Sequence, residues 1–404
     1  MRGANLAAIP ETRRLDSCSL CASHDLAELW SLPEYPFTEA FGPYDPDYPH
    51  VDQALMACSA CHHVQLLSQV DPSYLYAVEN YAYVPNLSPK YLDEYAFLEA
   101  FIMQALPESP RLQTLEFGAN NLDFARRLQD LSESVTVCDP LLPESTDEQG
   151  FKSVSQPIEE AIAAGLLGEP NLVVARHTLE HIGDPVTLLA TLFEMAARDA
   201  VLVFEVPSFE YLTWKLRFDS ITHQHIHYFS RTSVLQMAEA LDARISSLAI
   251  NPRGSNGGSL LFSLTRSASG REDTELGPSM CDSPSVDLSE IRKSIDRFEM
   301  QMMLMRASVD WDASSCFGFG ASLMLSTLDY HLRGSISDLE IIFDDDLRRH
   351  GESYKNVDVE VMSPNDPRFD SSGSFLITSL ENSRAIHRRL TDLGVHRIIS
   401  PLLS

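Results

Sequence analysis

The stretch from Arg111 to Pro140 constrains the fold of this chain more than any other. An apolar run ends at Phe117, a short turn begins at Gly118, an amphipathic run begins at Leu122, and a second apolar run closes on Asp139. A strand, a tight turn, a helix, a strand and an acid in this order are typical of one half of a doubly wound nucleotide-binding sheet. The chain is therefore predicted to be an α/β protein built on such a sheet.

The turn of this stretch indicates the kind of ligand. Gly118 lets the backbone turn sharply and approach a ligand closely, and Asp139 is placed to accept hydrogen bonds from a ribose diol. The dinucleotide pattern G-x-G-x-x-G is absent, because Asn120 and Asp123 stand where its second and third glycines would be. A nucleoside without a pyrophosphate, such as S-adenosylmethionine, is expected here. An ordinary strand, turn and helix without a ligand stays open, since short turns with few glycines are weak motifs.

Two CxxC pairs near the N-terminus form the most specific local motif of the chain. Each pair points two thiolates at one centre, and four thiolates complete a closed tetrahedral zinc site of the structural kind. The expected ligands are Cys18, Cys21, Cys58 and Cys61. Four unrelated free cysteines are the alternative, which the paired spacing disfavours. The neighbouring His24, His62 and His63 are expected at the surface, and the loop at 33–50, PEYPFTEAFGPYDPDYPH, is expected to be irregular.

Composition limits the domain count and the partners. At 404 residues the chain should hold two or three domains, at about 100–200 residues each. The net charge of −28 argues against nucleic acid as a partner, because a phosphate backbone needs a basic face. No apolar run approaches the length of a membrane span, and the N-terminus lacks an apolar signal core. Two cysteine pairs of metal-binding type favour a reducing cytoplasm. A cytoplasmic monomer or homodimer acting on a small molecule is expected.

The alternation of helices and strands continues after Asp139. A final pair of strands completes the order of a class I methyltransferase sheet. Helices are predicted at 158–167, 185–198 and 233–241, and strands at 171–175, 200–206, 244–250 and 259–265.

A second α/β unit is predicted near the C-terminus. A linker at 267–285 and a long helix at 287–308 lead into a strand and a glycine turn, Gly318-Phe319-Gly320. A further strand at 339–343 ends in three consecutive aspartates. The turn could hold a phosphate at a helix N-terminus, and a Rossmann-like unit without a cofactor is the alternative.

Three alternating histidines lie in the segment FDSITHQHIHYFSRTS. His223, His225 and His227 would share one side if this segment were extended. One imidazole could act as a general base, because its unperturbed pKa lies near 6.5. Structural roles and a metal site are the alternatives. A tyrosine cluster that includes Tyr81 and Tyr83 precedes the central strand, either as core and rim residues or as part of a substrate pocket.

These motifs together resemble a known family. The chain is similar to the three-domain S-adenosylmethionine-dependent sugar C-methyltransferases, which act on nucleotide-linked keto-deoxysugars in antibiotic pathways. The matching stretches are CSLC, CSAC, YAY, LEFGANN, ITHQHIHYFS, NGGSL, GFGAS and FDDDLRRHGESYKN. The resemblance implies a zinc-binding module at 1–75, a methyltransferase domain with a doubly wound sheet at 76–267, and a Rossmann-like domain at 268–404.

The resemblance also implies roles for individual residues. His225 would be the base that removes a proton next to a ketone, and the other catalytic candidates are His223, Gln224 and Tyr81. The candidates for binding S-adenosylmethionine are Glu116, Gly118, Asn120, Asp139, His177 and Tyr83.

The chain departs from the family at several of these motifs. Thr222 and Gln224 replace a tyrosine and a glutamate, Leu122 replaces the last glycine of the cofactor turn, and Met324 replaces a lysine. Carbon, oxygen or nitrogen methylation of a non-sugar acceptor, or ligand binding without turnover, therefore stays open.

Overall fold

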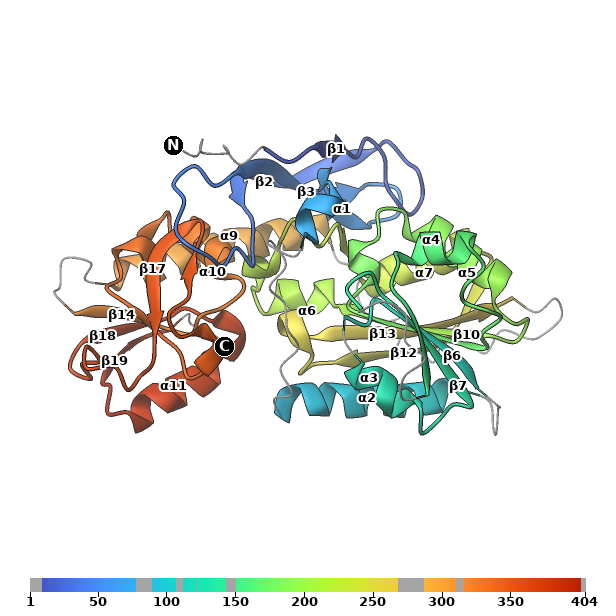
Figure 1. Cartoon of the computed structure of the whole chain (residues 1–404). Coiled ribbons are helices and arrows are strands. Elements are labelled where there is room, and N and C mark those ends of the chain that lie inside the picture. Colours follow the sequence, from blue (N-terminus) through green and yellow to red (C-terminus); the bar gives the residue numbers. More distant parts are fainter. Residues whose placement is uncertain are drawn as a thin grey trace, which may run out of the picture.

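A computed structural model describes residues 9–77, 89–106, 112–120, 122–142, 150–267, 287–309 and 315–400 of the chain. Two α/β units lie side by side, and the N-terminal strands run across both of them (Figure 1). The predicted tyrosines Tyr81 and Tyr83, and nearly all of the predicted linker at 267–285, fall outside the described residues.

The N-terminal part is a four-stranded sheet in the order β11-β4-β3-β2. It comprises β2 (Leu26–Pro36), β3 (His50–Cys58), β4 (Val64–Leu66) and β11 (His227–Tyr228), the last of which comes from far along the chain. β1 (Thr12–Arg14) and β5 (Ser68–Val70) form a separate pair, and α1 (Pro72–Leu75) follows. The segment expected to be irregular, 33–50, is irregular over 37–49, and its ends belong to β2 and β3, which had not been predicted. Two register shifts between these strands interrupt the period-two pattern of apolar residues that would have marked them.

The central sheet has seven strands in the order β12-β13-β10-β9-β6-β7-β8. Its strands are β6 (Gln113–Phe117), β7 (Ser134–Cys138), β8 (Phe151–Val154), β9 (Leu172–Arg176), β10 (Val201–Pro207), β12 (Ala243–Asn251) and β13 (Ser259–Arg266). Five are parallel, and β13 and β12 close the sheet in antiparallel pairs. Strands β9 and β10 are almost fully buried, because helices cover both faces of the sheet, and this explains their continuous apolar sequences.

Helices cover the two faces of the central sheet (Figure 1). One face packs against α2 (Pro89–Ala105) and α3 (Asp123–Leu128), and the other against α4 (Ile158–Ala163), α5 (Pro185–Met195) and α7 (Arg231–Ala240). A shorter helix, α6 (Phe209–Trp214), lies after β10. The predicted methyltransferase-type sheet is confirmed, while β8, only four residues long, had not been predicted.

The C-terminal sheet has six strands in the order β16-β17-β15-β14-β18-β19. They are β14 (Cys316–Phe319), β15 (Ile342–Phe343), β16 (Ser353–Tyr354), β17 (Val357–Met362), β18 (Ser374–Ile377) and β19 (Arg397–Ile399), with helices α10 (Leu325–His331) and α11 (Ser383–Asp392). The predicted second α/β unit is confirmed. Long helix α9 (Leu288–Ala307) shares one core with both β2 and the C-terminal sheet, so the parts pack together. In the described part of the chain, no helix is long and apolar enough to cross a membrane.

Candidate active site

Four cysteines converge at the end of the N-terminal sheet. The Sγ atoms of Cys18 and Cys61 lie 3.5 Å apart, those of Cys21 and Cys58 lie 3.6 Å apart, and all four lie within 4.8 Å of one another. Four sulfurs bound to one zinc ion at about 2.3 Å lie about 3.8 Å apart in a regular tetrahedron. The spacing fits zinc, and because the four thiolates fill its coordination shell, the ion is structural.

The three histidines beside the cysteines differ in exposure. His24 and His62 are exposed, as expected. His63 is fully buried, so the expectation that it lies at the surface was wrong. It packs against the central unit, where its ring nitrogens bond Ser233 and His227. A short apolar strand, Val64–Leu66, follows His63 directly and carries it into this contact.

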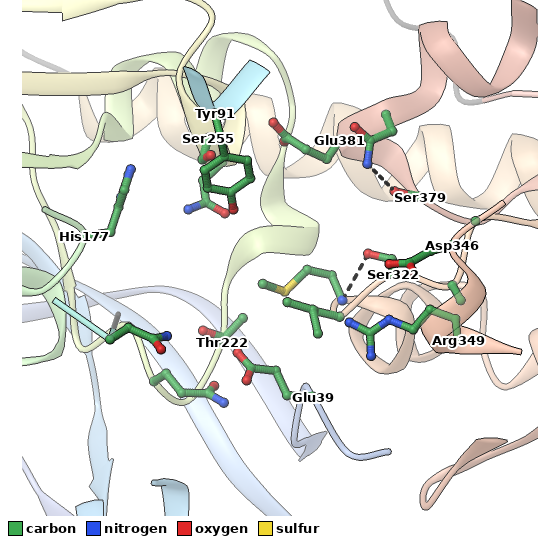
Figure 2. Close-up of a pocket in the computed structure, with 18 of the residues that line it drawn as sticks. Glu39, Tyr91, His177, Thr222, Ser255, Ser322, Asp346, Arg349, Ser379 and Glu381 are labelled. Atoms are coloured by element: carbon green, nitrogen blue, oxygen red, sulfur yellow. Dashed lines mark hydrogen bonds between the residues drawn. The ribbon is translucent and has the colours of Figure 1, made fainter. Parts of the chain in front are cut away.

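A cavity of about 520 Å³ opens between the three parts of the chain. Figure 2 shows His177 and Tyr91 on the side of the central unit, Ser322 and Arg349 facing them from the C-terminal unit, and Glu39 from the N-terminal part between them. The wall from the central unit includes Glu116, Gly118, Ala119, Asn120, Arg176, His177, His181, Thr222, Gln224 and His225. Because the cavity lies at the carboxyl ends of the parallel strands, it occupies the usual binding position of such sheets.

The turn after β6 forms one wall of this cavity. Gly118 has φ +67°, and a Cβ placed on it would lie 2.1 Å from the hydroxyl of Thr178. Asn120 is also left-handed, and its backbone N–H donates to Asp139 Oδ2 at 2.8 Å. Asp139 Oδ1 accepts from the N–H of Leu141 at 2.7 Å. The carboxylate of Asp139 therefore fixes the turn, and it lies beside the cavity lining.

Buried charges lie beneath the turn. Glu116 lines the cavity, and its Oε2 has no hydrogen-bond partner among the residues that the structure describes. Burial raises the pKa of Glu116 to about 8. Arg176 donates to Glu94 at 2.5 Å and to Glu205 at 3.1 Å, and its guanidinium lies over the ring of Tyr95. An unsatisfied carboxyl oxygen at a cavity wall suits a ligand that brings hydrogen-bond donors. The ammonium group and the ribose hydroxyls of S-adenosylmethionine are such donors.

The three alternating histidines point in three directions. His223 is buried, donates from Nε2 to the carbonyl of Tyr35 at 3.0 Å, and lies outside the cavity lining. His227 donates from Nε2 to the carbonyl of Ile182 at 2.8 Å. His225 alone among the three lines the cavity. A turn at 223–224 interrupts the segment, so the alternation that would have placed all three on one side does not exist.

The His225 ring packs edge-on against His181, with ring centroids 4.8 Å apart. Burial and the neighbouring His181 hold the pKa of His225 well below its usual range. His181 bonds the carbonyl of Gln224 through Nδ1 at 2.9 Å. The buried Glu180 lies close by, and within the described ranges neither of its carboxylate oxygens has a hydrogen-bond partner. Burial raises the pKa of Glu180 to about 8. Donor atoms of Glu180, His181 and His225 all lie within 4.8 Å of one another.

Comparison with known proteins agrees with this geometry. A family model described as a methyltransferase domain matches residues 90–248, and one described as a candidate zinc-binding domain matches residues 18–76. This chain is an S-adenosylmethionine-dependent methyltransferase. It carries an N-terminal zinc-binding domain and is a distant homologue of C-methyltransferase NovU from Streptomyces niveus. The two are 21% identical over 380 residues, which cover 87% of this chain and 86% of NovU.

Solved structures of methyltransferases are similar to part of this chain. N-methyltransferase NodS from Bradyrhizobium japonicum WM9 is 15% identical and covers 46% of this chain and 100% of its own, with a TM-score of 0.34. Magnesium protoporphyrin IX methyltransferase from Synechocystis PCC 6803 is 12% identical and covers 46% of this chain and 90% of its own, with a TM-score of 0.36.

Several cavity residues of the methyltransferase carried no sequence motif. Glu39 comes from the loop after β2, and Ser255 comes from the turn between β12 and β13. Ser255 donates to Glu94, which links this turn to the buried charges around Arg176. Glu180 lies outside the cavity lining but had a usable signal, because it stands three residues after the predicted His177. The assignments of individual residues to base and cofactor contacts stay predictions.

Proposed function

We propose that this methyltransferase adds a methyl group to a carbon of a nucleotide-linked keto-deoxysugar through an enolate. The observation that supports this most is the position of His225, the one histidine of its segment that opens on the cavity beside the Gly118 turn. Glu116, Gly118, Asn120, Asp139 and His177 are the residues we assign to S-adenosylmethionine. His223 and Gln224 belong to the same segment, and we give them supporting roles.

In the proposed reaction, the protein supplies a base and holds the acceptor carbon in line with the methyl group. S-adenosylmethionine supplies an electrophilic methyl group. His225 takes the proton from the carbon next to the ketone, and the electron pair of the broken C–H bond enters the enolate. The enolate carbon then bonds the methyl carbon, while the pair of the S–C bond returns to sulfur. The His225 pKa lies well below its usual range, so the ring is neutral and ready to accept a proton at pH 7.

Methylation of a different acceptor is the second candidate. Gln224, in place of a glutamate, accepts from Thr38 at 3.1 Å and brings no negative charge to His225. A base with a depressed pKa is a weak one, which suits an acceptor that ionises more readily than a carbon acid. Two of the cavity arginines already form ion pairs, Arg217 with Asp219 and Arg348 with Asp346, while Arg349 stacks over the ring of Phe41. A diphosphate group would have to compete with these carboxylates for Arg217 and Arg348.

Calorimetry followed by product analysis tests the proposal. S-adenosylmethionine should bind, and incubation with a thymidine-diphosphate 4-keto-deoxysugar should yield S-adenosylhomocysteine and a new C–CH₃ group. The matched 4-hydroxy sugar, which cannot form the enolate, should give neither. In D₂O, the keto sugar with S-adenosylhomocysteine should exchange its α-hydrogen. A methyl group on oxygen or nitrogen would establish the second candidate, and cofactor binding without turnover on any acceptor would indicate a binding protein.

Metal analysis separates the base from a metal-assisted reaction. The four thiolates predict about one zinc ion per chain. A second ion that disappears in His225→Asn would show that Glu180, His181 and His225 hold a metal. That outcome would remove His225 from the role of base.

We also propose that the chain divides at 1–75, 76–267 and 268–404. A reducing cytoplasm is the compartment we propose, because zinc needs its four cysteines reduced.

A further inference from the structure

The segment that carries His225 lies between the N-terminal zinc module and the central unit. We propose that the zinc module positions His225 over the cavity, with His63 and His227 as positioning residues. This inference rests on the proposed role of His225 as the base. It assigns to the module a part in methyl transfer, and none in binding S-adenosylmethionine.

The backbone after His225 belongs to the sheet of the zinc module. Strand β11 pairs antiparallel with β4, so that His227 stands opposite Gln65 and Tyr228 opposite Val64. The N–H of Leu66 extends this ladder by donating to the carbonyl of Ile226 at 2.9 Å. The residues just after His225 are therefore an edge strand of the same sheet whose β3 ends at the zinc ligand Cys58.

A buried pair of histidines joins the two parts through side chains. His227 donates from Nε2 to the carbonyl of Ile182, which can only accept, so its Nδ1 is free of a proton in the neutral ring. His63 must then donate from Nε2 to His227 Nδ1, at 3.1 Å. Its own Nδ1 accepts from the hydroxyl of Ser233 at 3.1 Å. Each position in this chain of hydrogen bonds has one donor and one acceptor, so both rings are fixed in orientation and tautomer.

Other bonds hold the segment before His225. The hydroxyl of Tyr35 donates to the carbonyl of Ile221 at 2.7 Å, and His223 donates back to the carbonyl of Tyr35. Thr38 donates to the side chain of Gln224. All these partners lie on β2 or just after it.

The far side of the segment is tied to the loop after β9. The N–H of Ile226 donates to the carbonyl of Glu180 at 2.8 Å, and His181 Nδ1 bonds the carbonyl of Gln224. His225 differs from its neighbours, because its ring makes no hydrogen bond within the described part of the chain and only packs against His181. A base with no hydrogen bond to fix it depends on its neighbours for position, and a misplacement of about 1 Å can cost about 100-fold in rate.

Hydrogen exchange and calorimetry on full-length, zinc-loaded protein test this inference. His63→Leu removes both hydrogen bonds of His63, and His63→Gln keeps an amide donor near the Nε2 position. The control is His62→Asn, next to it on the same knuckle but exposed, where asparagine tolerates the left-handed φ of 59°. Tyr35→Phe is a milder variant that removes only the bond to Ile221, in case His63→Leu fails to fold.

The expected result is a local change. His63→Leu should speed amide exchange in a peptide covering 221–229 by about tenfold, the factor for losing one buried hydrogen bond. Exchange in β6 and the affinity for S-adenosylmethionine should stay within about twofold of the parent. Methyl transfer to the active acceptor should fall at least tenfold, and His63→Gln should recover part of it. The control His62→Asn should match the parent, and Tyr35→Phe should loosen the start of the segment.

Two results would overturn the positioning role. One is unchanged exchange at 221–229 in both His63→Leu and Tyr35→Phe. The other is loosening of that peptide with no loss of methyl transfer. Failure of the proposed function would give a different result, because His225→Asn would then keep full methyltransferase activity. That activity is measured independently of hydrogen exchange.

Discussion

The central and C-terminal units contain the same glycine turn with different surroundings. Gly118 has φ +67° and Gly320 has φ +106°, and a Cβ on either would clash with a residue just beyond the neighbouring strand, Thr178 or Ser379. Asp139 accepts from the turn N–H of Asn120 and from the N–H two residues after itself, and Asp344 does the same with Ala321 and Asp346. The backbone conformation of the turn is therefore similar in the two units and does not indicate what each unit does.

The side chains around the two turns differ in kind. The first turn has a buried acid on its strand, Glu116, and faces His177, His181 and His225. The strand before the second turn carries Phe317 and Phe319. Asp346 and Arg349 line the cavity near this turn. A buried acid and three imidazoles gather at the first turn. We infer that the first unit holds the chemistry and the second offers a binding surface, because function depends on the side chains placed on a fold.

The largest expected effect removes the base from the first unit. His225→Asn should lower the turnover number by about 10²–10⁴, the usual contribution of general acid–base catalysis, with cofactor affinity and melting temperature unchanged. His387→Asn, an exposed histidine of α11 in the second unit, is the matched control and should behave as the parent. Steady-state kinetics of the two variants and the parent measure the turnover number. A joint fall in stability, cofactor affinity and rate would instead make His225 a structural residue.

The next effect compares the two glycines. Gly118→Ala should displace the turn that forms the cavity wall, because the new Cβ would meet Thr178 at 2.1 Å, and should therefore weaken binding of S-adenosylmethionine. Overpacking of this kind also costs about 1–3 kcal/mol of folding stability. Gly320→Ala meets Ser379 at 2.7 Å and should lower the melting temperature without changing cofactor affinity.

Gly165→Ala controls for the backbone strain alone, since it has φ +66° and nothing within 4 Å. Calorimetry and thermal melts separate the three variants. If Gly320→Ala weakened the cofactor as much as Gly118→Ala, the division of labour between the units would be wrong.

The sequence predicted these turns well and their surroundings poorly. Gly118 and Gly320 stand out because a short apolar strand ends at each, and local pattern suffices for such a motif. The directions of the His223 and His227 side chains could not be predicted from the sequence, because each is set by a hydrogen-bond partner far along the chain. His223 bonds Tyr35, and His227 bonds His63 and Ile182.

Zinc ligation needed only the CxxC spacing, and it was confirmed. Burial of His63 needed the contact between two units, which no local pattern contains. Glu39 belongs to the cavity for the same reason: the loop after β2 reaches it only through the packing of the N-terminal part across both units (Figure 1).

A moderate effect on cofactor affinity is expected when the aspartate that accepts hydrogen bonds from the turn, Asp139 or Asp344, is replaced. Asp139→Asn removes the negative charge and one acceptor site, and should weaken S-adenosylmethionine by about 1–3 kcal/mol, the range for a hydrogen bond to a charged group. Asp344→Asn makes the same change at the second turn and should leave cofactor affinity unchanged. Calorimetry with both variants, at matched melting temperatures, provides the measurement. Unchanged affinity in Asp139→Asn would place the ribose contact on another residue.

The smallest expected effect is the pH dependence, which tests whether proton chemistry belongs to the first unit. His225 acts in its neutral form, and its pKa lies well below the usual value of about 6.5, because burial and the nearby His181 disfavour the charged ring. The rate should therefore stay level from about pH 8 to about pH 6.5, and fall only as the pH drops below that range.

Gln224→Glu would place a carboxylate beside the ring and favour the imidazolium. The acidic limb of the pH–rate profile, where the rate falls, should then move to higher pH. Buried neutral histidines also make the fold less stable in acid, since the pKa values of His181 and His223 are lowered to about 4 and the unfolded chain binds their protons first as the pH falls. Melting temperatures at each pH must accompany the kinetics for this reason. A limb that stays in place in a folded, active Gln224→Glu enzyme would show that another group takes the proton.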